Sequence, residues 1–312
     1  MPLTAETRRK TGLGELLYSK CMTQPTLART IGFATCSQYR DLTSDDRILA
    51  SALERRGMNV LPVVWTEAKP ESLGCDLLVV RSVWDYHLRP QDFIRWIEAV
   101  SSRMKVLNPP EMIRWNMDKR YLQEIEAAGF PVPTTVFLDQ DGDADLAEVM
   151  HRGGFGQAVA KPVISASAYE TRRIDEPTLQ SNQWLNAMLK HRPMMVQEFV
   201  PEIQSDGEWS LIFAGMEFTH SVRKVPKPGD FRVQEEHGGL HKRAAPPADA
   251  LEMAQEILQR FAPQAVYCRV DLVMREDRAT LMELELIEPL LHFELAPEAT
   301  ELMAKKLAKA YR

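Results

Sequence analysis

The 312-residue sequence has few cysteines, and they show no spacing typical of a metal site or a disulfide framework. The four, Cys21, Cys36, Cys75 and Cys268, are scattered along the chain. This distribution is typical of small buried residues in a reducing compartment. The sequence also lacks an apolar run of about eighteen residues, which a membrane-spanning helix requires. We therefore expect a cytoplasmic protein that does not span a membrane.

An excess of positive charge is also missing. The chain has 38 Lys and Arg residues against 44 Asp and Glu residues, for a formal net charge of -6. This balance argues against a nucleic-acid-binding surface and favours small-molecule chemistry. With 45% hydrophobic and 26% charged residues, the sequence predicts a protein of two or three compact units. Assembly into a homo-oligomer stays open.

Residues 1–28 show little hydrophobic periodicity. They carry Arg8, Arg9, Lys10 and Lys20 and lack the apolar core of a secretory signal. We expect them to form a flexible tail; the alternative is that the true start of the chain is Met22.

Residues 29–115 alternate between strand and helix patterns, which predicts an open α/β unit with a mainly parallel sheet. The predicted strands are 31–34, 60–65 and 77–80, and the predicted helices begin near Ser44 and at Pro90. Substrates bind such sheets at the carboxyl ends of the strands, where the third strand runs into residues 81–86. Arg81 there could hold a substrate carboxylate and Asp85 an ammonium, with Trp84 and Tyr86 beside them. Alternatively, Arg81 and Asp85 pair with each other.

Residues 116–197 form the second predicted unit. A helix over 118–128 carries Lys119, and strand 158–163 carries Lys161. Strand 135–138 and helix 146–152 lie between them. The loop after Lys161 is rich in small residues, including Ser165 and Ser167, whose backbone amides can approach a phosphate closely. This signal is weak by itself, since serine and alanine are common in loops.

Residues 198–312 form the third predicted unit. A strand from Met194 ends at Pro201, and its backbone near 197–200 could pair with an adenine edge. Strands at 209–213 and 217–222, a polar loop over 223–239 and helices at 248–261 and 299–311 follow.

Three carboxylates distinguish this last unit. Segments 267–274 and 280–287 read as two strands of a hairpin, which places Asp271 opposite Glu283. Since side chains alternate along a strand, Glu285 projects from the same face. Such a face is hard to explain without a cation, and magnesium bound to ATP phosphates supplies one. The alternative is a hairpin edge whose acids face water.

The ordered motifs resemble the ATP-grasp ligases from about residue 30 to the end of the chain. The series is Lys119, Ala-Lys161-Pro, Gln197-Glu-Phe-Val200, Glu208, Arg232, Asp271 and Glu283-x-Glu285 before Pro289. Residues 81–86, 207–211, 229–234 and 237–239 are similar to the branch that contains glutathione synthetase-like proteins and the cycloserine-forming O-ureido-serine cyclo-ligase. The resemblance implies an α/β ATP-grasp fold with an N-terminal Rossmann-like domain.

The resemblance also implies a role for each matching residue. Lys119 and Lys161 would hold nucleotide phosphates, and the Glu198 and Val200 backbone would hold adenine, with Gln197 and Phe199 alongside. Glu208 would bind the ribose, while Lys224 and Arg232 would meet the terminal phosphate. The metal ligands of Mg²⁺ or Mn²⁺ would be Asp271, Glu283 and Glu285. His237 and Gly238 would close over the reacting group. From the residues alone, Lys119 or Lys224 could also be a surface lysine, and Gly238 part of a plain turn.

The implied activity is an ATP-dependent ligase that forms an amide bond through an acyl phosphate on a small amino-acid-like substrate. Lys161 and Arg232 would supply catalytic positive charge. Two positions depart from the pattern, because relatives commonly have Asn at Glu285 and often Gly at Ala168. The alternatives are a nucleotide-binding regulatory module and an enzyme that stops at phosphoryl transfer.

Overall fold

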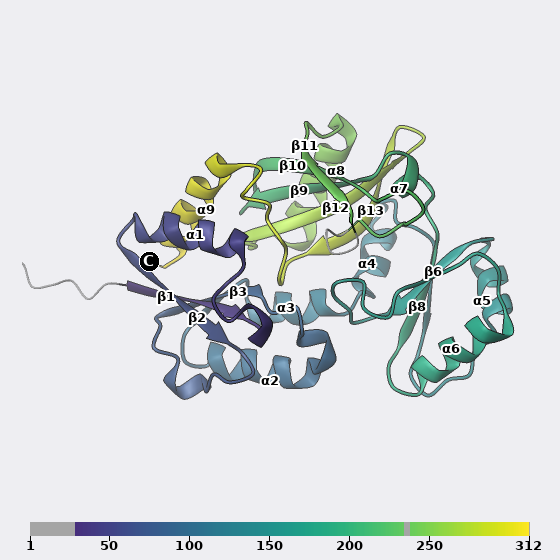
Figure 1. The fold of residues 1–312 in the computed structure, drawn as a ribbon, viewed down its shortest axis with the longest axis horizontal. Helices are drawn as coiled ribbons and strands as arrows, with labels where there is room; N and C mark the ends of the chain where they lie inside the picture. Colours follow the sequence, from purple (N-terminus) through teal and green to yellow (C-terminus); the bar gives the residue numbers. More distant parts are fainter. Residues whose placement is uncertain (1–28, 234–237, 312) are drawn as a thin grey trace, which may run out of the picture.

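A parallel four-stranded sheet forms the N-terminal part of the protein. The computed structural model describes residues 29–233 and 238–311. The strand order is β2-β1-β3-β4, and every pairing is parallel (Figure 1). The elements are β1 (Arg29–Thr35), α1 (Ser44–Glu54), β2 (Met58–Val64), β3 (Leu77–Ser82), α2 (Pro90–Ser101), β4 (Lys105–Leu107) and α3 (Pro110–Met117). The predicted open α/β unit is confirmed, and β4 is a short strand that the sequence analysis missed.

The second sheet is antiparallel, with the order β5-β8-β6-β7, and lies at the far right of Figure 1 beside helices α5 and α6. Its elements are α4 (Tyr121–Ala127), β5 (Thr135–Leu138), α5 (Leu146–Gly153), β6 (Ala158–Pro162), β7 (Arg172–Ile174), α6 (Leu179–Leu189) and β8 (Met194–Glu198). The predicted helix over 118–128 is too long, because α4 begins only at Tyr121. Lys119 therefore lies in the turn between α3 and α4, where its N–H donates to the Val163 carbonyl at 3.1 Å.

A five-stranded antiparallel sheet completes the protein, with the order β11-β10-β9-β12-β13. Its elements are α7 (Glu202–Ser205), β9 (Glu208–Ala214), β10 (Glu217–Val225), β11 (Leu240–Arg243), α8 (Ala248–Phe261), β12 (Tyr267–Arg275), β13 (Arg278–Glu285) and α9 (Pro297–Ala310). Strand β13 begins two residues before the predicted 280 and ends two before 287. The strand begins earlier because the turn before it has only two residues, Glu276 and Asp277, both at positive φ.

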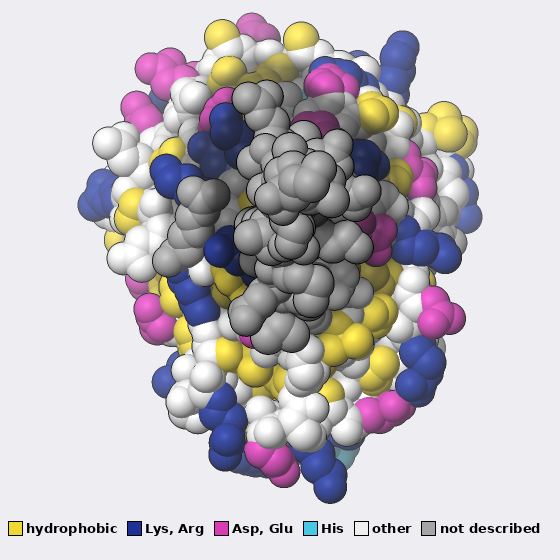
Figure 2. All heavy atoms as spheres, turned by 90° about the vertical axis from the view of Figure 1, so that its left-hand side faces the viewer, with side chains coloured by type: hydrophobic (Ala, Val, Ile, Leu, Met, Phe, Trp, Pro, Cys, Tyr) yellow, Lys and Arg dark blue, Asp and Glu magenta, His cyan; other side chains and the backbone are white. Residues whose placement is uncertain are grey.

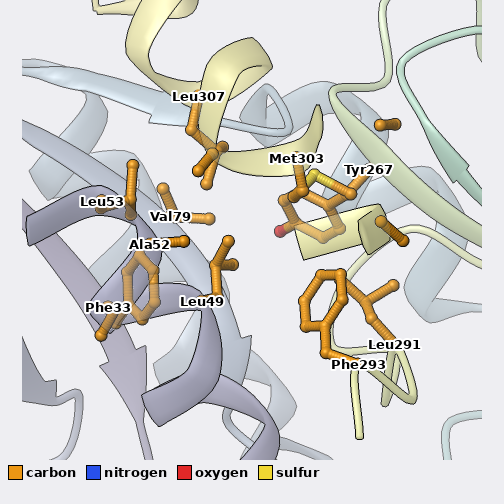
Figure 3. Packing of buried hydrophobic residues seen from close by; sticks show 14 of the residues in the cluster. Phe33, Leu49, Ala52, Leu53, Val79, Tyr267, Leu291, Phe293, Met303 and Leu307 are labelled. Atoms are coloured by element: carbon orange, nitrogen blue, oxygen red, sulfur yellow. The ribbon is translucent and has the colours of Figure 1, made fainter. Parts of the chain in front are cut away.

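The C-terminal helix α9 packs against α1 of the N-terminal part. Leu49 and Leu53 of α1 share one buried cluster with Met303 and Leu307 of α9 (Figure 3). Each of the predicted ranges 29–115, 116–197 and 198–312 contains most of the strands of one sheet. The division of the chain into three units at these boundaries stays a prediction. The expected tail at 1–28 lies outside the described residues.

Buried polar side chains join the first and third sheets. The Tyr267 hydroxyl of β12 donates to the Val80 carbonyl of β3 at 2.6 Å. The Asn108 amide donates to the carbonyls of Tyr267 and Leu286, at 3.0 and 2.8 Å. Buried polar groups need such partners, so these bonds fix β12 and β13 against the parallel sheet.

The outer edge of β13 is also satisfied by side chains. The Asn116 amide donates to the Leu284 carbonyl at 2.7 Å, and its oxygen accepts from the Leu286 N–H at 2.9 Å. The Tyr121 hydroxyl accepts from the Leu284 N–H at 2.9 Å. An edge strand otherwise exposes unpaired backbone groups, and here α3 and α4 cover them.

On the face drawn in Figure 2, Lys and Arg side chains are interspersed with Asp and Glu side chains. Within the described residues, no helix has the length and apolar character that crossing a membrane requires.

Candidate active site

A cavity of about 570 Å³ lies where the three sheets meet. Its wall includes α1 and the loop after β3 from the first sheet, β6 and the end of β8 from the second, and β9 and the β12–β13 hairpin from the third. The size suits a nucleotide or a small ligand pair. Most of the predicted site residues line this cavity.

The acidic hairpin forms part of the cavity wall. Asp271 is paired with Glu283 across the ladder, as the sequence predicted. The neighbouring pair is Arg269 with Glu285, and all four side chains line the cavity. The alternative of a solvated hairpin edge is therefore wrong. Arg269 was missed, although its position two residues before Asp271 places it on the same face by simple alternation.

Each of the three carboxylates has a cationic partner. Arg269 Nη2 lies 2.9 Å from Asp271 Oδ2 and also contacts Glu285. Lys119 Nζ lies 3.1 Å from Glu283 Oε1. Within the part of the chain that the structure describes, no three His, Cys, Asp or Glu side chains are grouped closely enough to hold a metal ion. In this structure Lys119 and Arg269 pair with the carboxylates. The role of the carboxylates as metal ligands stays a prediction.

The charge balance of this wall shows why a cation suits it. Burial raises the pKa of Glu285 to about 7; Arg269 opposes the rise, and the Asp271 and Glu283 carboxylates add to it. Burial also acts against ionised Asp271, but Arg269 and Lys224 hold its pKa below the usual range. The three carboxylates supply the hard oxygen donors that Mg²⁺ and Mn²⁺ prefer. The side chains of this wall therefore have the donor atoms that such an ion requires.

The predicted phosphate side of the cavity contains Lys161, Ser165 and Ser167. Burial lowers the pKa of Lys161, and the nearby Glu283 carboxylate opposes that shift. Lys119 Nζ donates to the Ser165 carbonyl at 2.8 Å and so ties the loop to the hairpin. Ser167 and Ala168 adopt φ values of 50° and 53°, the region that glycine adopts without strain. The alanine that replaces the usual glycine thus keeps a glycine-like conformation.

Gln197, Glu198, Phe199 and Val200 line the cavity at the end of β8. The Glu198 carboxylate pairs with Arg275 at 2.7 Å, and the Glu198 N–H donates to the Thr134 carbonyl at 2.8 Å. Phe199 and Val200 are buried. This arrangement is compatible with the predicted adenine site.

Glu208 and Lys224 contact each other and line the cavity on adjacent strands. Lys224 also lies 3.4 Å from Asp271 Oδ1. Lys224 is 5% exposed, so the alternative of a surface lysine is wrong. Gly207 makes the pairing possible, because its φ is +77° and a Cβ there would lie 2.4 Å from the Lys224 carbonyl.

Arg232 lines the cavity from the loop after β10. Its Nη2 lies 2.9 Å from Asp230 Oδ2, and this pairing is the main cause that lowers the pKa of Asp230. His237 lies outside the described residues. Gly238 is described, with a φ of +85°, but does not line the cavity.

The predicted substrate residues divide into two pairs. Trp84 and Tyr86 line the cavity. Arg81 does not, because its Nε is bonded to Asp46 Oδ1 at 2.7 Å and its Nη2 donates to the Pro289 carbonyl at 3.1 Å. Asp85 accepts from the Trp65 indole and also lies outside the lining. The substrate roles of Arg81 and Asp85 are therefore corrected, and the alternative pairing of Arg81 with Asp85 is wrong because Asp46 is the partner.

The lining residues Arg47, Glu288 and His292 were also not predicted from the sequence. Glu288 lies three residues after Glu285, beyond the end of β13, where strand alternation no longer predicts direction. His292 adopts a φ of 54° and lies beside His241. Only the fold brings α1 and residues 288–292 to one cavity.

Two family models match parts of the chain. Residues 31–108 match the N-terminal domain of D-cycloserine synthetase DcsG, and residues 131–284 match the ATP-grasp domain of prokaryotic glutathione synthetase. The crystal structure of D-cycloserine synthetase DcsG superposes with a TM-score of 0.79 at 22% identity, covering 91% of this chain and 100% of that one. The chain therefore has an ATP-grasp fold, and its residues 131–284 match an ATP-grasp domain model.

Individual relatives match much of the chain. The cycloserine biosynthesis protein DcsG of Streptomyces lavendulae is 27% identical over 266 residues, or 78% of this chain and 86% of the relative. A glutathione synthetase of Prochlorococcus marinus is 25% identical over 53% of this chain and 52% of its own length. The ATP complex of D-alanine–D-alanine ligase from Bacillus anthracis has a TM-score of 0.65 at 12% identity, covering 91% and 97% of the two chains.

Proposed function

We propose that this protein is an ATP- and Mg²⁺-dependent ligase that joins a carboxylate to an amine through an acyl phosphate. The observation that carries the proposal is the shared cavity. Lys119 and Lys161, the carboxylate-rich hairpin and the aromatic Trp84 and Tyr86 all line one space of nucleotide size. The relatives named as cycloserine and glutathione synthetases support a ligase that acts on small amino-acid-like substrates.

The proposed reaction has two displacements. A substrate carboxylate oxygen attacks the γ-phosphorus of ATP, and ADP leaves with the electrons of the broken P–O bond. The amine nitrogen then attacks the acyl carbon, phosphate leaves, and the nitrogen gives up a proton. The first step brings two anions together and the second releases an anionic phosphate, so the site must mainly align and neutralise charge.

The residues of this chain divide that work. Lys161 and Lys119 hold phosphate oxygens on the β6 side, and Arg232 approaches the terminal phosphate from the loop after β10. The backbone at 198–200 holds adenine, and Glu208 accepts the ribose hydroxyls. Arg269 joins the set, because its planar guanidinium already spans two carboxylates at the cavity wall and suits a developing oxyanion.

Asp271, Glu283 and Glu285 would hold Mg²⁺ or Mn²⁺. When bound, such an ion neutralises phosphate charge and polarises the phosphoryl group. The Glu285 carboxylate in place of the usual Asn adds a negative charge, which Arg269 offsets in this structure.

The first test is ADP release from the purified protein with Mg²⁺ and ATP. Amino acids, dipeptides and O-ureido-serine are added singly and in pairs. Stimulation by O-ureido-serine alone would support an intramolecular cyclo-ligase, and stimulation by a pair would support an intermolecular ligase. ADP release that needs only a carboxylate, with no amine, would indicate phosphoryl transfer alone. ATP binding without stimulated turnover would favour a regulatory nucleotide-binding module.

A further inference from the structure

The carboxylates that line the cavity differ in one respect. Five of the six take part in an ion pair: Glu198 with Arg275, Glu208 with Lys224, Asp271 with Arg269, Glu283 with Lys119 and Glu285 with Arg269. The sixth, Glu288, has no ion pair with any described residue. A carboxylate at the wall of a partly enclosed cavity is costly unless a cation approaches it.

The surroundings of Glu288 fix its position without pairing it with a cation. The Trp84 indole N–H donates to the Glu288 backbone carbonyl at 3.0 Å. The Tyr86 phenol lies beside the carboxyl group, and Tyr86 is 3% exposed. Burial raises the pKa of Glu288 to about 8, with Glu285 and Glu283 adding to the rise and Lys119 opposing it. The carboxyl group is therefore held in place with no cation paired to it, and an approaching cation would favour its ionised form.

The cations of the cavity show the converse pattern. Among those that line it, Lys161 and Arg47 make no ion pair with a described residue. Lys161 belongs to the proposed phosphate side. Arg47 projects from the first helical turn after Thr43 and is exposed.

Arg47 and Glu288 belong to segments that are bonded to each other. Asp45, in the same turn of α1 as Arg47, accepts from the N–H groups of Leu291 and Phe293, at 3.0 and 2.6 Å. Tyr39 and Trp84 meet edge to face nearby, with ring centroids 4.9 Å apart, and both line the cavity. This part of the cavity wall thus has an acid and a guanidinium, neither of them ion-paired with a described residue, together with the Tyr39–Trp84 aromatic pair. We call it the aromatic end of the cavity.

We propose that this end binds a zwitterionic amino acid, with Glu288 accepting the substrate ammonium and Arg47 pairing with its carboxylate. The assignment deepens the proposed ligase function and rests on it for the statement that this amino acid is the substrate. It replaces the corrected assignment of Arg81 and Asp85. Both contacts are charge-assisted, the strong class of hydrogen bond.

Calorimetric binding in the presence of Mg²⁺ and a non-hydrolysable ATP analogue tests this site without requiring turnover. The probes are serine and alanine, in both enantiomers, each against its 2-hydroxy analogue, glycerate or lactate. The wild-type protein should bind at least one amino acid roughly 10- to 100-fold more tightly than its hydroxy analogue, because the analogue lacks the ammonium. This comparison needs no mutant and is unaffected by a folding defect.

Two variants separate the two contacts. Glu288→Gln should weaken amino-acid binding by about 10- to 100-fold and leave the hydroxy acids unchanged. Arg47→Gln should weaken both ligand classes equally, since both have a carboxylate. Glu288→Asp should restore part of the preference for the amine. Glu294→Gln is the matched control, because Glu294 is exposed and lies outside the cavity lining.

The outcomes are distinct. Equal binding of amino acids and hydroxy acids by the wild type, or no binding of either, would overturn the zwitterion site. It would also be overturned if the Glu288→Gln protein melted normally and kept the wild-type preference for amino acids over hydroxy acids. Selective binding lost in Glu288→Gln supports the site. If that selective binding occurs while ADP release is never stimulated by any amino acid or dipeptide, the site stands and the ligase proposal fails.

Discussion

Two arginine networks in this protein use the same ion-pair chemistry in different settings. Arg81 pairs with Asp45 and Asp46, and all three side chains are at most 3% exposed. Arg269 pairs with Asp271 and Glu285, whose side chains are 4% and 22% exposed and line the cavity. The first network is enclosed by protein on every side. The second can exchange partners with a ligand, so contact with the cavity, and not the pairing itself, separates the proposed functional arginine from the structural one.

The largest expected effect is on the cavity side of this comparison. Asp271→Asn should lower stimulated ADP release by roughly 100- to 1,000-fold, because the site loses a metal ligand and its charge balance. Steady-state ADP release against a melting curve checks this. A folded Asp271→Asn protein with full activity would remove the metal assignment.

The enclosed network should respond in stability instead. Arg81→Ala leaves two buried carboxylates without their cation and should lower the free energy of unfolding by about 3–5 kcal/mol. The matched control is Arg55→Ala, which breaks an exposed pair with Glu301 at 2.7 Å and should cost less than about 1 kcal/mol.

Denaturant unfolding measures both variants. If the Arg81→Ala protein keeps its stability but requires a higher concentration of the carboxylate substrate, Arg81 belongs to the substrate site. The distinction between the two networks would then be wrong.

Ligand linkage should also separate the two networks. Mg²⁺ with ATP, at about 100 times its dissociation constant, should raise the stability of the wild type by ~2.7 kcal/mol. Asp271→Asn should lose most of that increase, whereas Arg81→Ala should keep it on a lower baseline. Thermal unfolding with and without Mg²⁺ distinguishes these outcomes, and equal loss in both variants would contradict the distinction.

The last expected effect is a pH dependence of the enclosed network. Burial raises the pKa of Asp45 from 3.8 to about 6, although Arg81 opposes the shift. Because the folded state holds this proton more tightly, its contribution to stability is complete below about pH 3.8 and is lost as the pH rises through 6. The free energy of unfolding of the wild type relative to Asp45→Asn should fall by ~3 kcal/mol at most across that range. A flat difference would show that Asp45 stays ionised.

The sequence predicted those parts of the site that depend on local periodicity. Alternation in a hairpin is enough to pair Asp271 with Glu283 and to place Lys161 on a strand. It could not show that Arg81, at the end of the third strand, points away from the cavity, because its partner Asp46 lies 35 residues earlier on α1. The same limit hid Arg47 and Glu288, whose common setting depends on contacts between distant segments. The short elements β4, β7 and β11 were missed because three or four residues carry too little periodic signal.

The Lys119 ammonium has a geometric consequence for any nucleotide that enters. An ammonium carries three N–H groups in a tetrahedral arrangement. One points to the Ser165 carbonyl at 2.8 Å and another to Glu283 at 3.1 Å. Among the described residues these contacts set the rotation of the group about its carbon–nitrogen bond, so the last hydrogen has a fixed direction before any phosphate arrives. Lys119 would then act as a directional guide, donating to a phosphate oxygen along one line and disfavouring approaches from elsewhere.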